Sequence, residues 1–319
     1  MTTLVTGVAG FIGFHLADRL LSQGEPVIGV DNFTPYYLPE LKVDRAAELQ
    51  RRYGGSFILL RTDFADHEAL RSALNGHAFA RIAHLGAQPG VRYSIENPHA
   101  YAHSNLTGHL NLLELARARR VPMVYASSSS VYGANAKVPF SEADPAEHPV
   151  SLYAATKRAN ELMSESYAHL YDIPLTGLRF FTVYGPWGRP DMAPWIFTEA
   201  ILTAQPIKLF NYGQMRRDFT FIDDIIDGVV AALDREAYGH RVYNLGNSRP
   251  EELSGLIEAI EQACGRTALR ESHPMQPGDV EVTYADVGAA GADLSFAPRT
   301  DLQSGIGRFV DWFRGYRNL

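Results

Sequence analysis

The chain has 319 residues, of which 46% are hydrophobic and 20% are charged. These values exclude a disordered chain and, at roughly 150 residues per domain, suggest two folded units or one large α/β unit with an attached lobe. The net charge of −7 argues against general nucleic-acid binding, because an acidic protein repels polyanions. A local basic cluster could still bind a small anion.

Cys264 is the single cysteine, so neither an intrachain disulfide nor a Cys-rich metal site can form. The eleven histidines lack metal-ligand spacing, and we predict no metal site. No apolar run reaches membrane-spanning length. The first predicted strand begins at Thr3, which leaves no room for an export signal. We therefore expect a cytoplasmic protein.

Apolar runs of strand length alternate with helical patterns through the first 181 residues. Strands are predicted over residues 3–6, 26–30, 56–61, 81–85, 123–126 and 175–180, and helices over residues 11–23, 68–74, 100–119 and 154–171. This alternation predicts βαβ units and an α/β fold, with a Rossmann-type doubly wound parallel sheet covered on both faces.

The pattern changes beyond Phe181. Residues 182–191 are rich in glycine and proline and predict no regular element, and a helix is expected over 194–204. Two returns to the sheet are predicted near 219–222 and 242–245, followed by two helices and a loop at 273–279 within residues 250–319. We expect a Rossmann domain of residues 1–181 and 215–249, and a smaller discontinuous α/β lobe of residues 182–214 and 250–319.

Three glycines with the spacing G-x-x-G-x-x-G lie between the first predicted strand and the first helix. Gly7 permits a tight turn, Gly10 lets the backbone approach a pyrophosphate, and Gly13 lets helix and strand pack closely. Asp31 ends the second strand, 24 residues after Gly7, where a carboxylate accepts hydrogen bonds from a ribose and repels a 2′-phosphate. The pattern therefore favours NAD over NADP. Asp63 is expected to bind the adenine amino group or to cap a helix.

A tyrosine and a lysine four residues apart, Tyr153 and Lys157, lie on one face of a predicted helix. Tyrosine titrates near pH 10, and a nearby ammonium lowers its pKa toward the range of a useful base. The serines of Ser127–Ser130 follow the strand predicted over residues 123–126, at the sheet edge where ligands bind. One of them could bond the same substrate hydroxyl as Tyr153. Asn105 is expected either to orient this site or to lie on a helix surface.

Together these motifs resemble those of the extended short-chain dehydrogenases/reductases. Within them the chain is most similar to the nucleotide-sugar 4-epimerases, in particular to those that act on UDP-glucuronate. The resemblance covers essentially the whole chain and is closest over Asp31–Tyr37, His84–Ser94, Ser127–Gly133 and Arg179–Met192.

The resemblance implies reversible 4-epimerisation of UDP-glucuronate to UDP-galacturonate through a 4-keto intermediate. Tyr153 would take the proton of the sugar 4-hydroxyl while the C4 hydride passes to bound NAD. Lys157 would lower the tyrosine pKa and hold the nicotinamide ribose, and Ser128 would orient the hydroxyl. The implied cofactor contacts are Gly7, Gly10, Phe11, Ile12, Gly13, Asp31, Asn32, Asp63, Phe64, Leu85, Gln88, Tyr153 and Lys157.

The resemblance also implies a site for the sugar carboxylate. Oxidation of a uronate at C4 gives a β-keto acid that readily loses carbon dioxide, so fixed donors must hold its carboxylate out of alignment with the carbonyl. The donors that the resemblance implies are Ser129, Thr182 and Arg189, with Arg92 close by. Arg217 would bind the diphosphate and Lys208 and Phe210 the uracil, while Gln276 stands where many such enzymes carry a second diphosphate arginine. The implied substrate contacts are Arg92, Ser128, Ser129, Ser130, Tyr153, Thr182, Arg189, Lys208, Phe210, Arg217 and Gln276.

Single residues help to distinguish this reaction from those of related enzymes. The 4,6-dehydratases place an Asp-Glu pair where this chain has Ser129 and Ser130, and the UDP-glucuronate decarboxylases place a glutamate at Ser130. Galactose-type 4-epimerases carry asparagine at Thr182. A UDP-glucose/galactose 4-epimerase and a UDP-glucuronate decarboxylase stay open as alternatives. A non-catalytic NAD-binding regulator is less expected, because Tyr153 and Lys157 are both present.

The resemblance further implies a homodimer. In these enzymes the helices that correspond to residues 100–119 and 154–171 form a four-helix bundle across the dimer interface. Both segments carry apolar residues on more than one face, which fits such an interface, although burial in the core explains the pattern equally well.

Overall fold

The computed structural model describes residues 1–135, 137–235, 238–275 and 282–319. Its central sheet has seven parallel strands in the order β10-β6-β5-β4-β1-β2-β3. The strands are β1 (Thr3–Thr6), β2 (Val27–Asp31), β3 (Phe57–Arg61), β4 (Arg81–His84), β5 (Met123–Ser128), β6 (Leu175–Phe180) and β10 (His240–Leu245). The chain order reverses at β1, between β2 and β4, which is where parallel α/β sheets bind ligands at their carboxyl edge.

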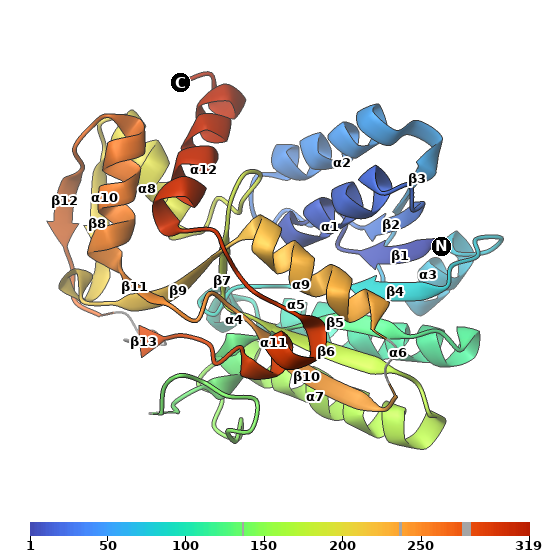
Figure 1. Ribbon diagram of the computed structural model, residues 1–319. Coiled ribbons are helices and arrows are strands. Elements are labelled where there is room, and N and C mark those ends of the chain that lie inside the picture. The colour runs from blue at the N-terminus through green and yellow to red at the C-terminus, as the bar shows by residue number, and fades with distance from the viewer. Residues whose placement is uncertain (136, 236–237, 276–281) are drawn as a thin grey trace.

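Helices cover both faces of this sheet, which confirms the predicted doubly wound fold (Figure 1). One face carries α1 (Phe11–Ser22), α2 (Pro39–Tyr53) and α9 (Ile222–Asp234), and the other carries α6 (Gly108–Arg119) and α7 (Leu152–Tyr171). The short helices α3 (His67–Ala73), α4 (Tyr93–Glu96) and α5 (Pro98–Tyr101) lie in the connections, as do the 3-10 turns Gly54–Ser56 and Ser129–Tyr132.

Helix α7 begins where it does because the Ser151 hydroxyl accepts a hydrogen bond from the Ala154 amide at 3.1 Å. Its buried side chains include Lys157, Glu161 and Ala168, which recur at helical spacing and face the sheet. No such cap exists at α1, since its N-cap residue is Gly10. The amides of the first turn of α1 are thereby left for a ligand.

The helix predicted over residues 100–119 is not continuous. Between α5 and α6, residues Ala102–Thr107 form a π-helical turn. The Asn105 carbonyl accepts a hydrogen bond from the Asn160 side chain at 2.6 Å, and the buried Asn105 amide pairs with both backbone groups of Gln88. A π-turn frees a carbonyl of the helix for such a partner. Asn105 therefore orients the neighbouring loop, as one of its two interpretations predicted.

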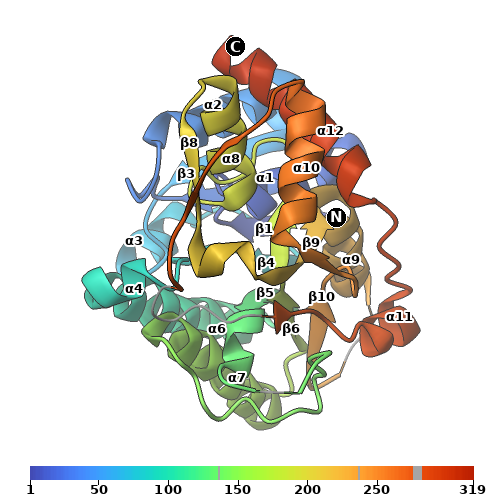
Figure 2. The ribbon, with the colours of Figure 1, turned by 90° about the vertical axis from the view of Figure 1, so that its left-hand side faces the viewer.

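A smaller unit lies beside the carboxyl edge of the sheet (Figure 2). Its sheet is built on β9 (Arg216–Phe221), which pairs with β7 (Thr182–Tyr184), β11 (Pro250–Glu252) and β13 (Val282–Thr283). A second, parallel pair joins β8 (Pro206–Leu209) to β12 (Leu269–Ser272). The helices here are α8 (Ala193–Leu202), α10 (Leu253–Cys264), α11 (Gly288–Leu294) and α12 (Leu302–Arg317), with a 3-10 turn at Phe210–Gly213. Aromatic contacts join α8 to α12, with the rings of Trp195 and Phe313 4.9 Å apart.

Other elements also differ from the predictions. Helix α2 was not predicted, and β7 lies inside a segment that was expected to be irregular. The strand near 219–222 pairs in the smaller sheet and not in the central one, because β7 and β11 flank it there. The described part of residues 250–319 holds three helices, where two were expected.

No helix in the described part of the chain combines the length and the apolar character that crossing a membrane requires.

Candidate active site

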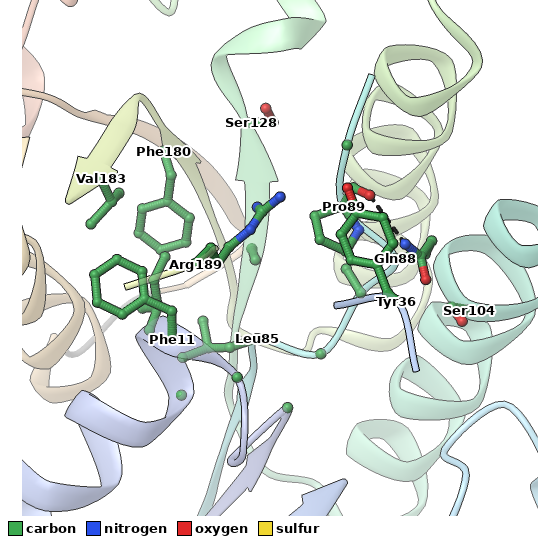
Figure 3. Close-up of a pocket in the computed structure, with 18 of the residues that line it drawn as sticks. Phe11, Tyr36, Leu85, Gln88, Pro89, Ser104, Ser128, Phe180, Val183 and Arg189 are labelled. Atoms are coloured by element: carbon green, nitrogen blue, oxygen red, sulfur yellow. Dashed lines mark hydrogen bonds between the residues drawn. The ribbon is translucent and has the colours of Figure 1, made fainter. Parts of the chain in front are cut away.

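A cavity of about 420 Å³ opens at the carboxyl ends of β1, β2, β4, β5 and β6 (Figure 3). It brings together most of the residues that the motifs predicted. Those in its lining are Gly7, Gly10, Phe11, Ile12, Gly13, Asp31, Asn32, Phe64, Leu85, Gln88, Ser128, Ser129, Ser130, Tyr153, Lys157, Thr182 and Arg189.

The glycine turn forms a cradle that larger residues would fill. Gly7 has a φ of +69°, and a Cβ on it would lie 2.6 Å from the Cα of Gly86. A Cβ on Gly13 would overlap the Gly7 carbonyl oxygen and lie 2.8 Å from its carbon. The close approach of helix α1 to strand β1 therefore requires glycine at both positions. The turn and the uncapped end of α1 fit the pyrophosphate of a dinucleotide.

Asp31 stands at the end of β2, beside this turn. Its carboxylate accepts hydrogen bonds from the backbone amides of Ala9, at 3.0 Å, and Phe33, at 2.8 Å. Burial raises the pKa of Asp31, against the lowering charge of Lys42. Asp63 does not line the cavity, but its Oδ2 accepts a hydrogen bond at 3.0 Å from Asn32, which does. These contacts fix Asp31 where a ribose with free hydroxyls would fit.

Tyr153, Lys157 and Ser128 meet at the end of β5. Burial raises the pKa of Tyr153, while the hydrogen bond with Ser128 and the positive charge of Arg189 lower it. Burial also lowers the pKa of Lys157 to about 7, and its Nζ donates to the Ala126 carbonyl at 2.9 Å. In this structure the groups that oppose the raising of the tyrosine pKa are Ser128 and Arg189, and the effect of Lys157 on that pKa stays a prediction.

A buried ion pair supports the serine turn from behind. Glu161 accepts two hydrogen bonds from Arg179, both at 2.8 Å, and one from the Ser127 hydroxyl at 2.7 Å. Although burial raises its pKa, the bonds from Arg179 lower the pKa of Glu161, so it stays a carboxylate. The negative charge of Glu161 partly opposes the lowering of the Lys157 pKa by burial. Sequence reasoning missed this pair, although Glu161 follows Lys157 by one helical turn, which places it on the same face.

Arg189, the predicted carboxylate ligand, lines the cavity but already holds a carboxylate of this chain. Its Nε and Nη2 donate to the two oxygens of Asp191 at 3.0 and 2.5 Å. Ser129, Ser130 and Thr182 line the same cavity. The Ser130 amide donates to the Ser128 hydroxyl at 3.2 Å, which shapes the 3-10 turn that carries these serines.

Four of the remaining predicted substrate contacts, Arg92, Lys208, Phe210 and Arg217, lie outside the cavity lining. The Arg92 guanidinium lies 5.2 Å from the centre of the Phe210 ring. Lys208 is exposed on β8 and Arg217 lies on β9, while Gln276 falls outside the described residues. Their contacts with a nucleotide stay predictions.

Several lining residues were not predicted as contacts. Tyr36, Tyr37 and Lys42 reach the cavity from the loop after β2 and from α2. Lys42 is buried and donates to the Thr34 carbonyl at 2.8 Å. The missed helix hid Lys42, although the buried residues Leu41 and Leu49 give α2 an amphipathic spacing that could have revealed it.

The site combines a dinucleotide cradle with a hydroxyl-lined pocket that ends at a tyrosine. Such an arrangement can move a proton at a substrate hydroxyl beside a nicotinamide. Among the described residues, no cluster of three or more His, Cys, Asp or Glu side chains could hold a metal ion.

Comparison with known proteins agrees with this geometry. A family model described as the NAD dependent epimerase/dehydratase family matches residues 3–246. UDP-glucuronate 4-epimerase 4 of Arabidopsis thaliana is 47% identical, over 99% of this chain and 76% of that protein. A probable UDP-glucuronate 4-epimerase of Rhizobium meliloti (strain 1021) is 46% identical, over 99% of this chain and 98% of that protein. The crystal structure of a UDP-glucuronic acid 4-epimerase from Bacillus cereus, in complex with UDP-glucuronic acid and NAD, matches with a TM-score of 0.91 and 32% identity, over 99% of this chain and 100% of that one.

Proposed function

The chain belongs to the NAD dependent epimerase/dehydratase family, and on that basis we propose that it interconverts UDP-glucuronate and UDP-galacturonate by epimerisation at C4. The observation that carries the proposal is one cavity that unites the glycine cradle, Tyr153 and a group of hydroxyl and guanidinium donors. Relatives of 46–47% identity over 99% of this chain bear the name of this activity.

NAD is the cofactor, and when bound it would supply reversible hydride chemistry at C4 of the sugar. The glycine turn and the first turn of α1 would hold its pyrophosphate, and Asp31 its adenosine ribose. Tyr153 would take the proton of the sugar 4-hydroxyl at its Oη and give it back at the end of the cycle. Ser128, which bonds Tyr153, would orient that hydroxyl. Lys157 would place the nicotinamide ribose and stabilise the phenolate.

The hydroxyl and guanidinium groups that line the same cavity as Tyr153 favour a uronate over a neutral sugar. Ser129, Ser130, Thr182 and Arg189 offer several donors to a carboxylate within one cavity. Donors held by the protein fix the plane of that carboxylate. A β-keto acid loses carbon dioxide only when the breaking bond aligns with the carbonyl, so a fixed carboxylate protects the intermediate.

The test is turnover of UDP-glucuronate by the purified protein, with UDP-galacturonate measured by anion-exchange chromatography and released carbon dioxide measured in parallel. We expect UDP-galacturonate without carbon dioxide, and no turnover by Tyr153→Phe. A decarboxylase would release carbon dioxide, a neutral-sugar epimerase would convert only UDP-glucose, and a non-catalytic binder would convert neither. Full activity of Tyr153→Phe would contradict the role of the tyrosine.

Two finer statements belong to the same proposal. We propose a homodimer through residues 100–119 and 154–171, because Leu162 and Leu170 on α7 are 56% and 64% exposed in the single chain. Leu162→Glu should then shift the protein to monomers in sedimentation, whereas an unchanged mass would contradict this interface. A cytoplasmic location is also proposed, since Cys264 has no cysteine to pair with, which fits a reducing compartment.

A further inference from the structure

Three side chains from two loops meet at one wall of the cavity. Arg189 donates to both oxygens of Asp191, and Tyr36 donates its hydroxyl to Oδ2 of the same carboxylate at 2.9 Å. Arg189 and Tyr36 line the cavity (Figure 3). Asp191 is not among the described residues that line it, whereas both of its partners are.

Both loops are held in place. Arg45 on α2 is fully buried and donates to the carbonyls of Trp187 and Gly188, in the loop that carries Arg189. The Tyr36 ring packs against Tyr93 with its centre 4.9 Å away. Asp191 therefore meets Arg189 in a fixed place.

The pairing determines which part of Arg189 faces a ligand. A bidentate pair commits Nε and one terminal nitrogen, the edge with which arginine binds carboxylates most tightly. Arg189 is left with Nη1 outside this pair, and the negative charge of Asp191 offsets its own. An anionic group in the cavity therefore meets a donor that orients it but binds it weakly.

Weak binding matters for the reaction proposed above, on which this inference rests. After oxidation at C4, the sugar must turn over to receive the hydride on its other face, and its carboxylate must move with it. A tight salt bridge to Arg189 would oppose that motion. We propose that Asp191, held by Tyr36, is a positioning residue that keeps the hold of Arg189 on the sugar carboxylate weak enough for the sugar to turn.

The test uses Asp191→Asn in the full-length protein with its bound nucleotide. An asparagine places an amide donor against a guanidinium donor, which frees Arg189 for the ligand. We expect the KM and the dissociation constant for UDP-glucuronate to fall about 3- to 10-fold and kcat to fall about 10-fold. The dissociation constant for UDP-glucose should change less than about twofold, since a neutral sugar offers no carboxylate.

Two further variants make the result specific. Tyr36→Phe removes one hydrogen bond to Asp191 without changing charge, and we expect the same directions with changes of about 2- to 3-fold. This variant also serves if Asp191→Asn fails to fold. Asp227→Asn is the matched control, because it breaks the exposed Arg19–Asp227 ion pair of 2.6 Å, and neither of these residues lines the cavity. It should leave every parameter unchanged.

The inference is overturned if Asp191→Asn raises the KM for UDP-glucuronate, leaves both parameters unchanged, or alters the binding of UDP-glucose equally. A wild-type protein that does not convert UDP-glucuronate would instead refute the proposed function. The two dissociation constants would then still decide whether Asp191 restrains Arg189.

Discussion

We expect the buried ammonium of Lys157 to lower the free energy of unfolding of the protein. Its side chain is 3% exposed, and burial lowers its pKa from 10.5 to about 7. Each pKa unit corresponds to about 1.4 kcal/mol between the two protonation states, so the buried ammonium costs about 5 kcal/mol relative to the unfolded chain. Methionine has nearly the same length without the charge. We therefore predict that Lys157→Met is inactive but more stable than the wild type.

The cost of burying Lys157 should depend on pH, because its pKa differs between the folded and the unfolded protein. Below pH 7 the lysine is protonated in both states, and the whole cost applies. Between pH 7 and 10.5 the folded protein releases the proton while the unfolded chain keeps it, so the cost falls to about 2 kcal/mol at pH 9. Loss of the hydrogen bond to the Ala126 carbonyl costs the variant about 1–3 kcal/mol at every pH. The advantage of the variant should thus shrink by about 3 kcal/mol from pH 6 to pH 9.

Urea unfolding of nucleotide-free wild type and variant at pH 6 and pH 9 measures this difference. Comparing the two pH values removes contributions that do not depend on protonation, including the lost hydrogen bond. Titrating groups elsewhere are common to both proteins and cancel. An advantage that is equal at the two pH values, or larger at pH 9, would refute the reasoning.

Two other substitutions test the scaffold of the site. Gly13→Ala should reduce bound NAD at least about 10-fold and lower the unfolding temperature, because its Cβ would overlap the Gly7 carbonyl. Gly307→Ala is the control, because nothing lies within 4 Å of a Cβ at that position. An unchanged NAD content in Gly13→Ala would contradict the proposed role of the glycine turn. Glu161→Gln should destabilise the protein by about 3–5 kcal/mol, because Arg179 is then buried without its carboxylate. Urea unfolding measures this loss of stability. The double variant Glu161→Gln with Arg179→Met should recover part of the lost stability. If Glu161→Gln alone leaves the stability unchanged, the ion pair is not needed for the fold.

The central sheet could be predicted because its inner strands, such as β1, β2 and β6, are buried on both faces and read as short apolar runs. Strand β1, for example, is predicted and found at Thr3–Thr6. The sheet that a strand joins is harder to predict. Strand β9 has buried residues from Asp218 to Phe221, like a strand of the central sheet, and only its pairing with β7 and β11 assigns it to the smaller one. Pairing over long distances leaves no local pattern in a sequence.

The motifs predicted much of the cavity wall but not the partners of the residues they named. Ser128, Tyr153 and Lys157 line one cavity as expected. The Asp191 partner of Arg189 stands two residues away in the sequence, yet nothing in the spacing indicates a bidentate pair. The pKa of Tyr153 depends on burial, which a sequence pattern cannot measure. Residue types thus predict chemistry, whereas burial and partners require the fold.

Arg45 joins the glycine turn to the loop that carries Arg189. Arginine is rarely fully buried without a carboxylate, because its desolvation is costly. Here the acceptors are carbonyls and a hydroxyl: Nη1 donates to Ala9 at 3.0 Å and to Tyr37 at 2.8 Å, and the other nitrogens donate to Trp187 and Gly188. Ala9 belongs to the glycine turn and Trp187 to the loop of Arg189. Because one fully buried side chain bonds both segments, a displacement of the glycine turn would also disturb the loop of Arg189, and the two parts of the proposed site are held together.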